Sequence, residues 1–163
     1  MKLAVFGGTG KGGQFLVPRA LDAGHEVVAL SRNPARMTLQ HERLTLVKGS
    51  IQDAASVDEV IRGADAVVSS LGANSKEPPF SISKGFDNIL PSMKAQNVRR
   101  LIMSVGAVIY DPLDKPQIPN HLFHFIWMNF QKSVYEDMLQ VVEKVRASDL
   151  DWTIVRVPYL TER

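Results

Sequence analysis

The chain has 163 residues, 45% hydrophobic and 22% charged, which is typical of a single soluble globular domain. A net charge of only +2 argues against a nucleic-acid-binding surface, and the absence of cysteine excludes disulfides, a thiol nucleophile and thiolate metal ligands. No apolar run approaches the roughly 20 residues that span a bilayer. We therefore expect a cytoplasmic protein with no metal, nucleic-acid or membrane partner.

Near its start the chain has an apolar run, residues 3–6, that leads directly into Gly7, Gly10 and Gly13. A buried strand followed by such glycines is the turn that lets a backbone approach a dinucleotide pyrophosphate. Gly7 permits the tight turn, Gly10 removes a side chain near the phosphate, and Gly13 lets the next helix lie against the strand. That helix, predicted over 12–23, directs its free N–H groups at the phosphates. The alternative is an ordinary strand-to-helix turn.

A second apolar run, residues 27–30, is followed by Ser31 and Arg32. An NAD-preferring site places Asp or Glu about 20 residues beyond the glycines, where it accepts from the ribose 2′-hydroxyl. No acidic residue stands there, and the Arg32 guanidinium instead offers fixed donors to a 2′-phosphate. The pattern favours NADPH; the alternative is that Arg32 and Arg36 are solvated loop cations.

Apolar runs and helical patterns alternate along the whole chain. The runs are short and continuous, as in parallel strands covered on both faces. Asp53 is expected to cap a helix, whereas Pro18 lies inside one and should kink it or remove a hydrogen bond. The alternation predicts an α/β fold, a doubly wound parallel sheet (Rossmann fold) in three αβα layers, with residues 1–163 forming one domain. Strands are expected at 2–6, 26–30, 44–48, 65–70, 99–104 and 152–157, and helices near 12–23, 53–62, 82–96 and 130–147.

Several segments, taken in order, resemble the atypical short-chain dehydrogenase/reductases that have an NAD(P)H-binding domain. Within that group the likeness is to biliverdin-IXβ reductase/flavin reductase and the NmrA-like proteins. The resemblance covers essentially the whole chain; it is specific for cofactor binding and much less so for the substrate. The segments that carry it are residues 5–10, 24–27, 31–32, 49–53, 65–68 and 145–156.

The resemblance implies a role for each matching position. Arg32 and Arg36, which follow Ser31, would hold the 2′-phosphate. Ser50 and Ile51 would flank the adenine, although many relatives carry Asp in place of Ser50. The nicotinamide ribose would lie beside Leu71 and Gly72, and the pyrophosphate would be wrapped by Gly7, Thr9, Gly10, Lys11 and Gly12.

Catalytic residues are harder to identify. Carbonyl-reducing short-chain dehydrogenases need a Tyr-x-x-x-Lys pair, but Leu139 stands four residues after Tyr135, and Asp114 four after Tyr110. Hydride transfer to a flavin does not require this pair, because the cofactor carries the chemistry and the protein supplies orientation. The candidate catalytic residue is Ser104, expected near the carboxyl end of the fifth strand; the alternative is a strand-end serine satisfied by the backbone.

Residues 110–130 carry prolines, two histidines and several aromatic side chains. They could stack on a planar acceptor such as a flavin, or form a helical stripe that packs on the core or a second subunit. Relatives continue beyond the sixth strand with a further strand and helix. The chain is either a short member or a part of a longer one, and a wide cleft and a poorly covered sheet edge would favour a homodimer.

Two functions are therefore considered. The first is an NADPH-dependent reductase that transfers hydride to a flavin-like or other planar conjugated acceptor. The second is a non-catalytic NADP(H)-sensing regulator resembling NmrA-like proteins, which the missing Tyr-x-x-x-Lys pair also fits.

Overall fold

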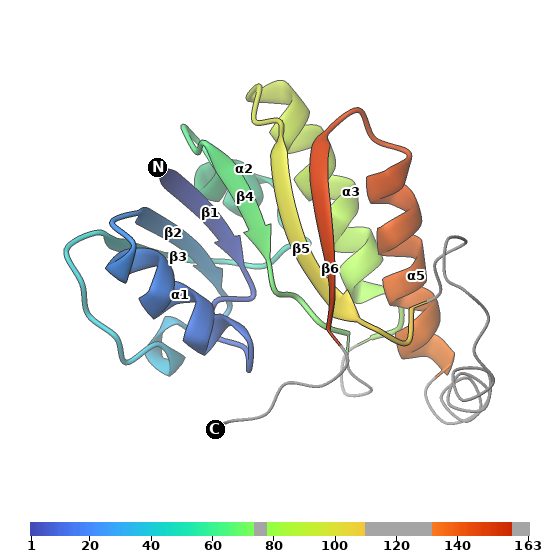
Figure 1. The fold of residues 1–163 in the computed structure, drawn as a ribbon, viewed down its shortest axis with the longest axis horizontal. Coiled ribbons are helices and arrows are strands. Elements are labelled where there is room, and N and C mark those ends of the chain that lie inside the picture. The colour runs from blue at the N-terminus through green and yellow to red at the C-terminus, as the bar shows by residue number, and fades with distance from the viewer. Residues whose placement is uncertain (74–77, 110–131, 158–163) are drawn as a thin grey trace.

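A computed structural model of the chain describes residues 1–73, 78–109 and 132–157. Six strands form one sheet in the order β3-β2-β1-β4-β5-β6, and every neighbouring pair runs parallel (Figure 1). The strands are β1 (Lys2–Phe6), β2 (Glu26–Ser31), β3 (Leu44–Lys48), β4 (Ala66–Ser69), β5 (Arg100–Gly106) and β6 (Asp151–Val157). The helices are α1 (Gly13–Asp22), α2 (Ala54–Ile61), α3 (Ser81–Ala95) and α5 (Lys132–Arg146), with a 3₁₀ helix, η1 (Pro34–Arg36).

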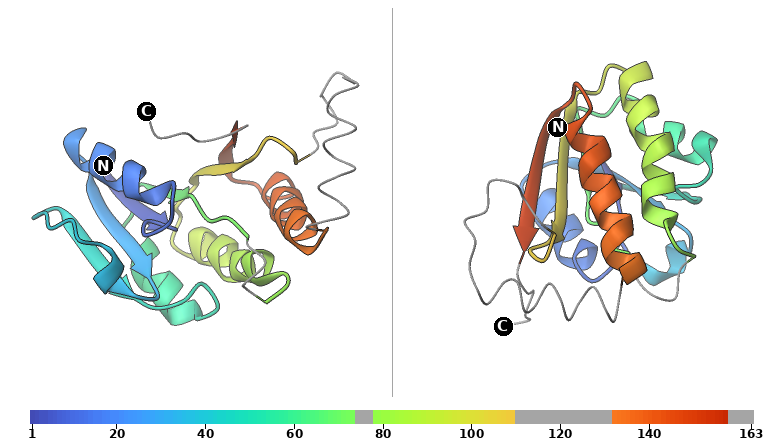
Figure 2. Two further views of the ribbon diagram at one scale, coloured as in Figure 1. Left: turned by 90° about the horizontal axis from the view of Figure 1, so that it is seen from below. Right: turned by 90° about the vertical axis from the view of Figure 1, so that its right-hand side faces the viewer.

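The helices lie in two layers, one on each face of the sheet. Helix α1 covers one face, and α2, α3 and α5 cover the other (Figure 2). Successive side chains of β1 point to opposite faces, so Leu3 and Val5 pack with Val17 of α1, while Ala4 and Phe6 join the larger core on the other side. The doubly wound, three-layer α/β fold predicted from the sequence is confirmed.

Each strand and helix lies within two residues of its predicted range. Asp53 caps α2 as expected, accepting from the backbone N–H groups of Ala55 and Ser56 at 3.2 and 3.3 Å. Helix α1 continues through Pro18, whose missing N–H leaves the Gln14 carbonyl without its usual helical donor. The 3₁₀ helix η1 was not expected; the Asn33 side chain caps it by accepting from the Ala35 N–H.

Two kinds of feature were sought among the described residues, a membrane-spanning helix and a metal-binding cluster. None of their helices is long and apolar enough to cross a membrane. They also contain no group of three or more His, Cys, Asp or Glu side chains placed to hold a metal ion.

Candidate functional site

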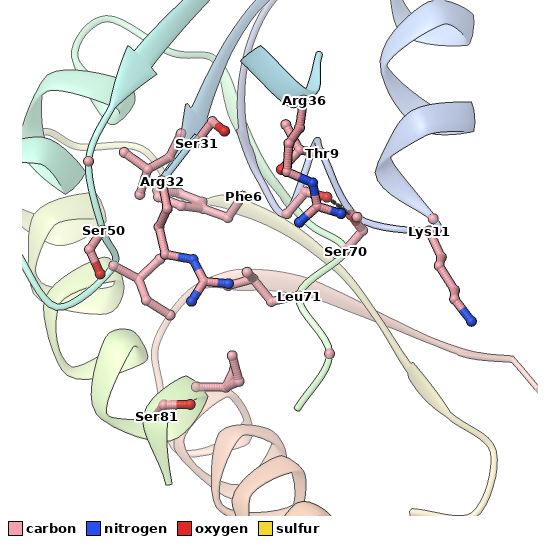
Figure 3. A pocket seen from close by; sticks show the side chains of 18 of the residues that line it. Phe6, Thr9, Lys11, Ser31, Arg32, Arg36, Ser50, Ser70, Leu71 and Ser81 are labelled. Carbon is pink, nitrogen blue, oxygen red and sulfur yellow. Dashed lines mark hydrogen bonds between the residues drawn. The ribbon is translucent and has the colours of Figure 1, made fainter. Parts of the chain in front are cut away.

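A cavity of about 470 Å³ opens at the carboxyl edge of the sheet, beside the end of β1. Strand β1 lies between β2 and β4, so the chain winds away from it in both directions and leaves a crevice at this point. Five segments line the cavity: the glycine loop, the end of β2 with η1, the loop after β3, the end of β4 and the first turn of α3 (Figure 3). This is where open parallel sheets bind ligands, and the volume is that of a small-molecule site.

The glycine loop has the backbone that its sequence predicts. Gly7 has a φ of +86°, and a Cβ there would lie 2.8 Å from the Ser70 carbonyl carbon at the end of β4. The Gly7 carbonyl accepts from the Gly10 N–H at 3.0 Å and from the Ser70 hydroxyl at 3.1 Å. The loop is therefore held against β4 at a position where only glycine fits.

Gly13 lets α1 approach the loop closely. A Cβ on Gly13 would overlap the Gly7 carbonyl oxygen and lie 2.5 Å from the Gly8 backbone. The helix begins after Gly12 with no side-chain cap and no acidic residue in its first turn. The N–H groups of Gln14 and Phe15 in its first turn donate to the backbone carbonyls of Gly10 and Gly12 at 3.1 and 3.2 Å. The positive end of the helix dipole lies at the cavity edge, where Gly12 is a lining residue.

The cavity is cationic. Lys11 comes from the glycine loop, Arg32 follows β2 and Arg36 is carried by η1 (Figure 3). The described residues that line the cavity include no Asp or Glu. Such a lining suits a polyanion, because phosphate oxygens can accept from these cations without facing a carboxylate.

Ser31, the last residue of β2, also lines this part of the cavity. It is only 3% exposed, and its hydroxyl has no hydrogen-bond partner among the described residues. A buried hydroxyl without a partner is costly. A ligand hydroxyl or phosphate bound at the end of β2 would therefore give the Ser31 hydroxyl the hydrogen-bond partner that it lacks among the described residues.

The loop after β3 forms the opposite wall. The Ser50 hydroxyl donates to the Gln52 side-chain carbonyl at 2.9 Å, and the Gln52 amide donates to the Ser81 carbonyl at 2.5 Å. Asn88 of α3 donates to the Ile51 carbonyl at 2.8 Å. This wall is therefore fastened to α3 rather than standing as a free loop.

Asp53, the next residue, caps α2 behind this wall. Its carboxylate accepts from the Ser56 hydroxyl and from the N–H groups of Ala55 and Ser56. These hydrogen bonds, the one from the Ser56 hydroxyl above all, hold the pKa of Asp53 below its usual value of 3.8. Because Asp53 is occupied in this way, its role is to fix the start of α2.

The structure brings most of the sequence-predicted residues to one cavity. Gly13 supports the loop from behind. Ser104 is not among the lining residues; it lies half-buried within β5, opposite Val155 of β6. The predicted residues that line the cavity are Gly7, Thr9, Gly10, Lys11, Gly12, Ser31, Arg32, Arg36, Ser50, Ile51, Leu71 and Gly72.

Sequence reasoning gave no role to Gln52, Ser70, Ser81 and Ile82, which also line the cavity. Gln52 directly follows Ser50 and Ile51, and that neighbourhood could have marked it as a lining residue. Nothing in the local sequence around Ser81 indicates that it lines the cavity. Residues 110–130, the candidate acceptor-binding segment, lie outside the described residues. In α5, Tyr135 is buried and Leu139 follows four residues later, so this helix offers no Tyr-x-x-x-Lys pair.

Comparisons with known proteins agree with this geometry. The model of the NAD(P)H-binding family matches residues 7–163. Cinnamoyl-CoA reductase 1 of Petunia hybrida is 32% identical over 125 residues, covering 67% of this chain and 38% of that protein. A (4-alkanoyl-5-oxo-2,5-dihydrofuran-3-yl)methyl phosphate reductase of Streptomyces griseus is 26% identical over 154 residues, covering 94% of this chain and 46% of that protein.

Solved structures show the same fold. A short-chain dehydrogenase/reductase of Veillonella parvula, crystallised with NADP, superposes with a TM-score of 0.78 at 21% identity, covering 95% of this chain and 68% of that one. Across five curated relatives, the chain matches between 24% and 57% of those proteins' own lengths. At these identities the solved structures support the fold alone.

Proposed function

The chain belongs to the NAD(P)H-binding family, and on that premise we propose that it is an NADPH-dependent reductase of a flavin-like or other planar conjugated acceptor. The observation that carries the cofactor preference is the charge of the cavity. Arg32 and Arg36 lie where β2 ends, and no carboxylate is present among the lining residues. A bare ribose 2′-hydroxyl needs an acidic acceptor there, whereas a 2′-phosphate needs cationic donors.

The residues present fit such a cofactor. The glycine loop leaves room for a pyrophosphate, and the start of α1 presents the positive end of its dipole there. The unpartnered Ser31 hydroxyl and the two arginines would hold the 2′-phosphate end. Ser50 and Ile51 would flank the adenine, and Leu71 and Gly72 would lie beside the nicotinamide ribose.

A planar acceptor is proposed because it asks least of the protein. A bound reduced nicotinamide would supply a hydride, that is two electrons and a proton, to the acceptor, and solvent would supply any further proton. A flavin takes up a hydride without a protein acid of matched pKa, so the missing Tyr-x-x-x-Lys pair in α5 is no obstacle. The chain's own residues then bind, orient and exclude water.

The first test follows reduced-nicotinamide absorbance when the protein meets NADPH and FMN, with NADH alongside. Saturable oxidation that favours NADPH is expected. Arg32→Ala should then weaken NADPH binding by about tenfold to a hundred and fiftyfold, the cost of one charge-assisted hydrogen bond at about 1.5–3 kcal/mol. NADH binding should change little, because NADH has no 2′-phosphate.

The outcomes are distinct. Equal losses for NADPH and NADH in Arg32→Ala would overturn the 2′-phosphate assignment. Tight NADPH binding without any turnover of FMN or other planar acceptors would overturn the reductase and favour the NADP(H)-sensing alternative.

A further inference from the structure

The first turn of α3 forms part of the cavity wall, through Ser81 and Ile82. The residue at its N-cap position, Phe80, cannot cap it, since a phenyl ring has no acceptor and the backbone stands in the left-handed region at a φ of 60°. The N–H groups of Ile82 and Ser83 are the ones that an N-cap side chain normally satisfies. They need an acceptor from elsewhere in the chain.

Asp137 of α5 supplies that acceptor. Its two carboxylate oxygens accept separately, one from the Ile82 N–H at 3.1 Å and the other from the Ser83 N–H at 2.7 Å. The side chain is only 2% exposed. A buried carboxylate is tolerated where hydrogen bonds and the positive end of a helix compensate its charge. Asp137 is therefore the cap of α3, contributed by another helix.

The same turn of α3 holds the loop after β3. Gln52 donates to the Ser81 carbonyl and accepts from the Ser50 hydroxyl. One turn further along α3, the Ile51 side chain packs directly on Gly85, in the space that a Cβ would occupy. A continuous set of contacts thus runs from Asp137 through the start of α3 to the wall formed by Ser50 and Ile51.

We propose that Asp137 is a positioning residue of the cofactor site, which fixes the adenine wall by capping α3. The inference rests on the proposed placement of the adenine beside Ser50 and Ile51. It assigns Asp137 no contact with the cofactor. Loss of its carboxylate should make the wall less rigid and weaken binding of the adenosine half of the cofactor. This effect does not depend on how the nicotinamide half binds.

The experiment measures cofactor binding by isothermal titration calorimetry for the wild type, Asp137→Asn and Asp137→Ala. The temperature is kept well below the Tm of each protein, so that all three are folded. An asparagine can accept only at its carbonyl oxygen, so it leaves one N–H of the pair without a partner. We expect NADPH, NADH and adenosine 2′,5′-bisphosphate each to bind the variants about tenfold more weakly. The NADPH-to-NADH preference should stay unchanged, in contrast to Arg32→Ala.

Asp87→Asn is the matched control. Asp87 is an acidic residue of α3 that also contacts α5, through an ion pair with Lys144 at 2.7 Å. Asp87 does not itself bond to the first turn; Lys144 donates to the Ser83 carbonyl at 2.8 Å and keeps that bond in Asp87→Asn. Its loss should leave all three affinities unchanged. A loss in Asp87→Asn equal to that in Asp137→Asn would overturn the proposal, because any weakened contact between the two helices would then suffice.

A measurement on the wild type covers the case in which the Asp137 variants do not fold. Adenosine 2′,5′-bisphosphate should shift the amide resonances of Ser81, Ile82 and Ser83; unmoved resonances at saturation would overturn the proposal. Failure of the wild type to bind NADPH would overturn the proposed function itself. Normal binding by the wild type and by Asp137→Asn alike would overturn only the role of Asp137.

Discussion

At Gly13 the lack of a side chain is a packing requirement. A Cβ at this position would overlap the carbonyl oxygen of Gly7, which belongs to the same turn and cannot swing aside as a flexible side chain would. Gly13→Ala should therefore lower the free energy of unfolding by about 1–3 kcal/mol, the usual cost of overpacking. Urea unfolding of the two proteins measures the difference.

Gly12→Ala provides the comparison for Gly13. Gly12 is the preceding residue, has an α-helical backbone, and a Cβ there would meet only the Ser70 side chain at an ordinary 3.7 Å. Its substitution should cost less than that of Gly13, at most about 1 kcal/mol, because alanine is a weaker N-cap than glycine. If Gly12→Ala destabilised the protein as much as Gly13→Ala, backbone overlap would not be the reason for the glycine.

Individual residues of the site differ in how well the sequence predicts them. Gly7 and Arg32 act through properties that their own type carries, a permitted backbone conformation and a fixed charge, at a set distance along the chain. The positions of Gln52 and Ser81 depend on where α3 packs, and Asp137 reaches its partners across 55 residues of sequence. Such contacts follow from tertiary packing, which local patterns do not encode.

Among the elements, α2 shows how a cap links stability to pH. The Ser56 hydroxyl and two backbone N–H groups stabilise the Asp53 carboxylate and lower its pKa in the folded protein. A lowered pKa contributes stability that is complete above the unfolded value of 3.8 and is lost as the pH falls through the lower folded value. Unfolding of α2 should therefore become easier in acid for this reason.

Asp53→Asn isolates this contribution. Asparagine is also a good N-cap but does not titrate. The stability advantage of the wild type over Asp53→Asn, measured by urea unfolding, should be complete at about pH 7 and should shrink as the pH falls below the unfolded value of 3.8 toward the lower folded pKa. An advantage that stays the same over this pH range would show that the charge of Asp53 contributes nothing.

The elements themselves were predictable because each pattern is local. Short continuous apolar runs such as residues 27–30, rich in Val, are typical of a strand covered on both faces. The start of α3 was less open to inference, since Phe80 gives no capping signal and the cap lies in α5. Tertiary structure here replaces a local signal that the sequence lacks.

At the scale of the whole molecule, the order of strands in the sheet brings the walls of the cavity together, and this couples ligand binding to stability. The glycine loop, η1, the loop after β3 and α3 come from separate parts of the chain and meet only in the folded state. A ligand held by all of them binds the native protein and not the unfolded chain. Its binding therefore raises the free energy of unfolding, by an amount that grows with the ratio of ligand concentration to Kd.

Thermal unfolding with each cofactor tests this coupling and the cavity's charge together. NADPH at about 100 times its Kd should stabilise the fold by about 2.7 kcal/mol, raising Tm by about 5–11 °C for a domain of this size. NADH at the same concentration should raise Tm less, by about half if its Kd is tenfold higher. Arg32 and Arg36 are exposed, so added salt should screen the 2′-phosphate and narrow the difference between the cofactors. A difference that persists undiminished at about 1 M salt would argue against a charge-based preference.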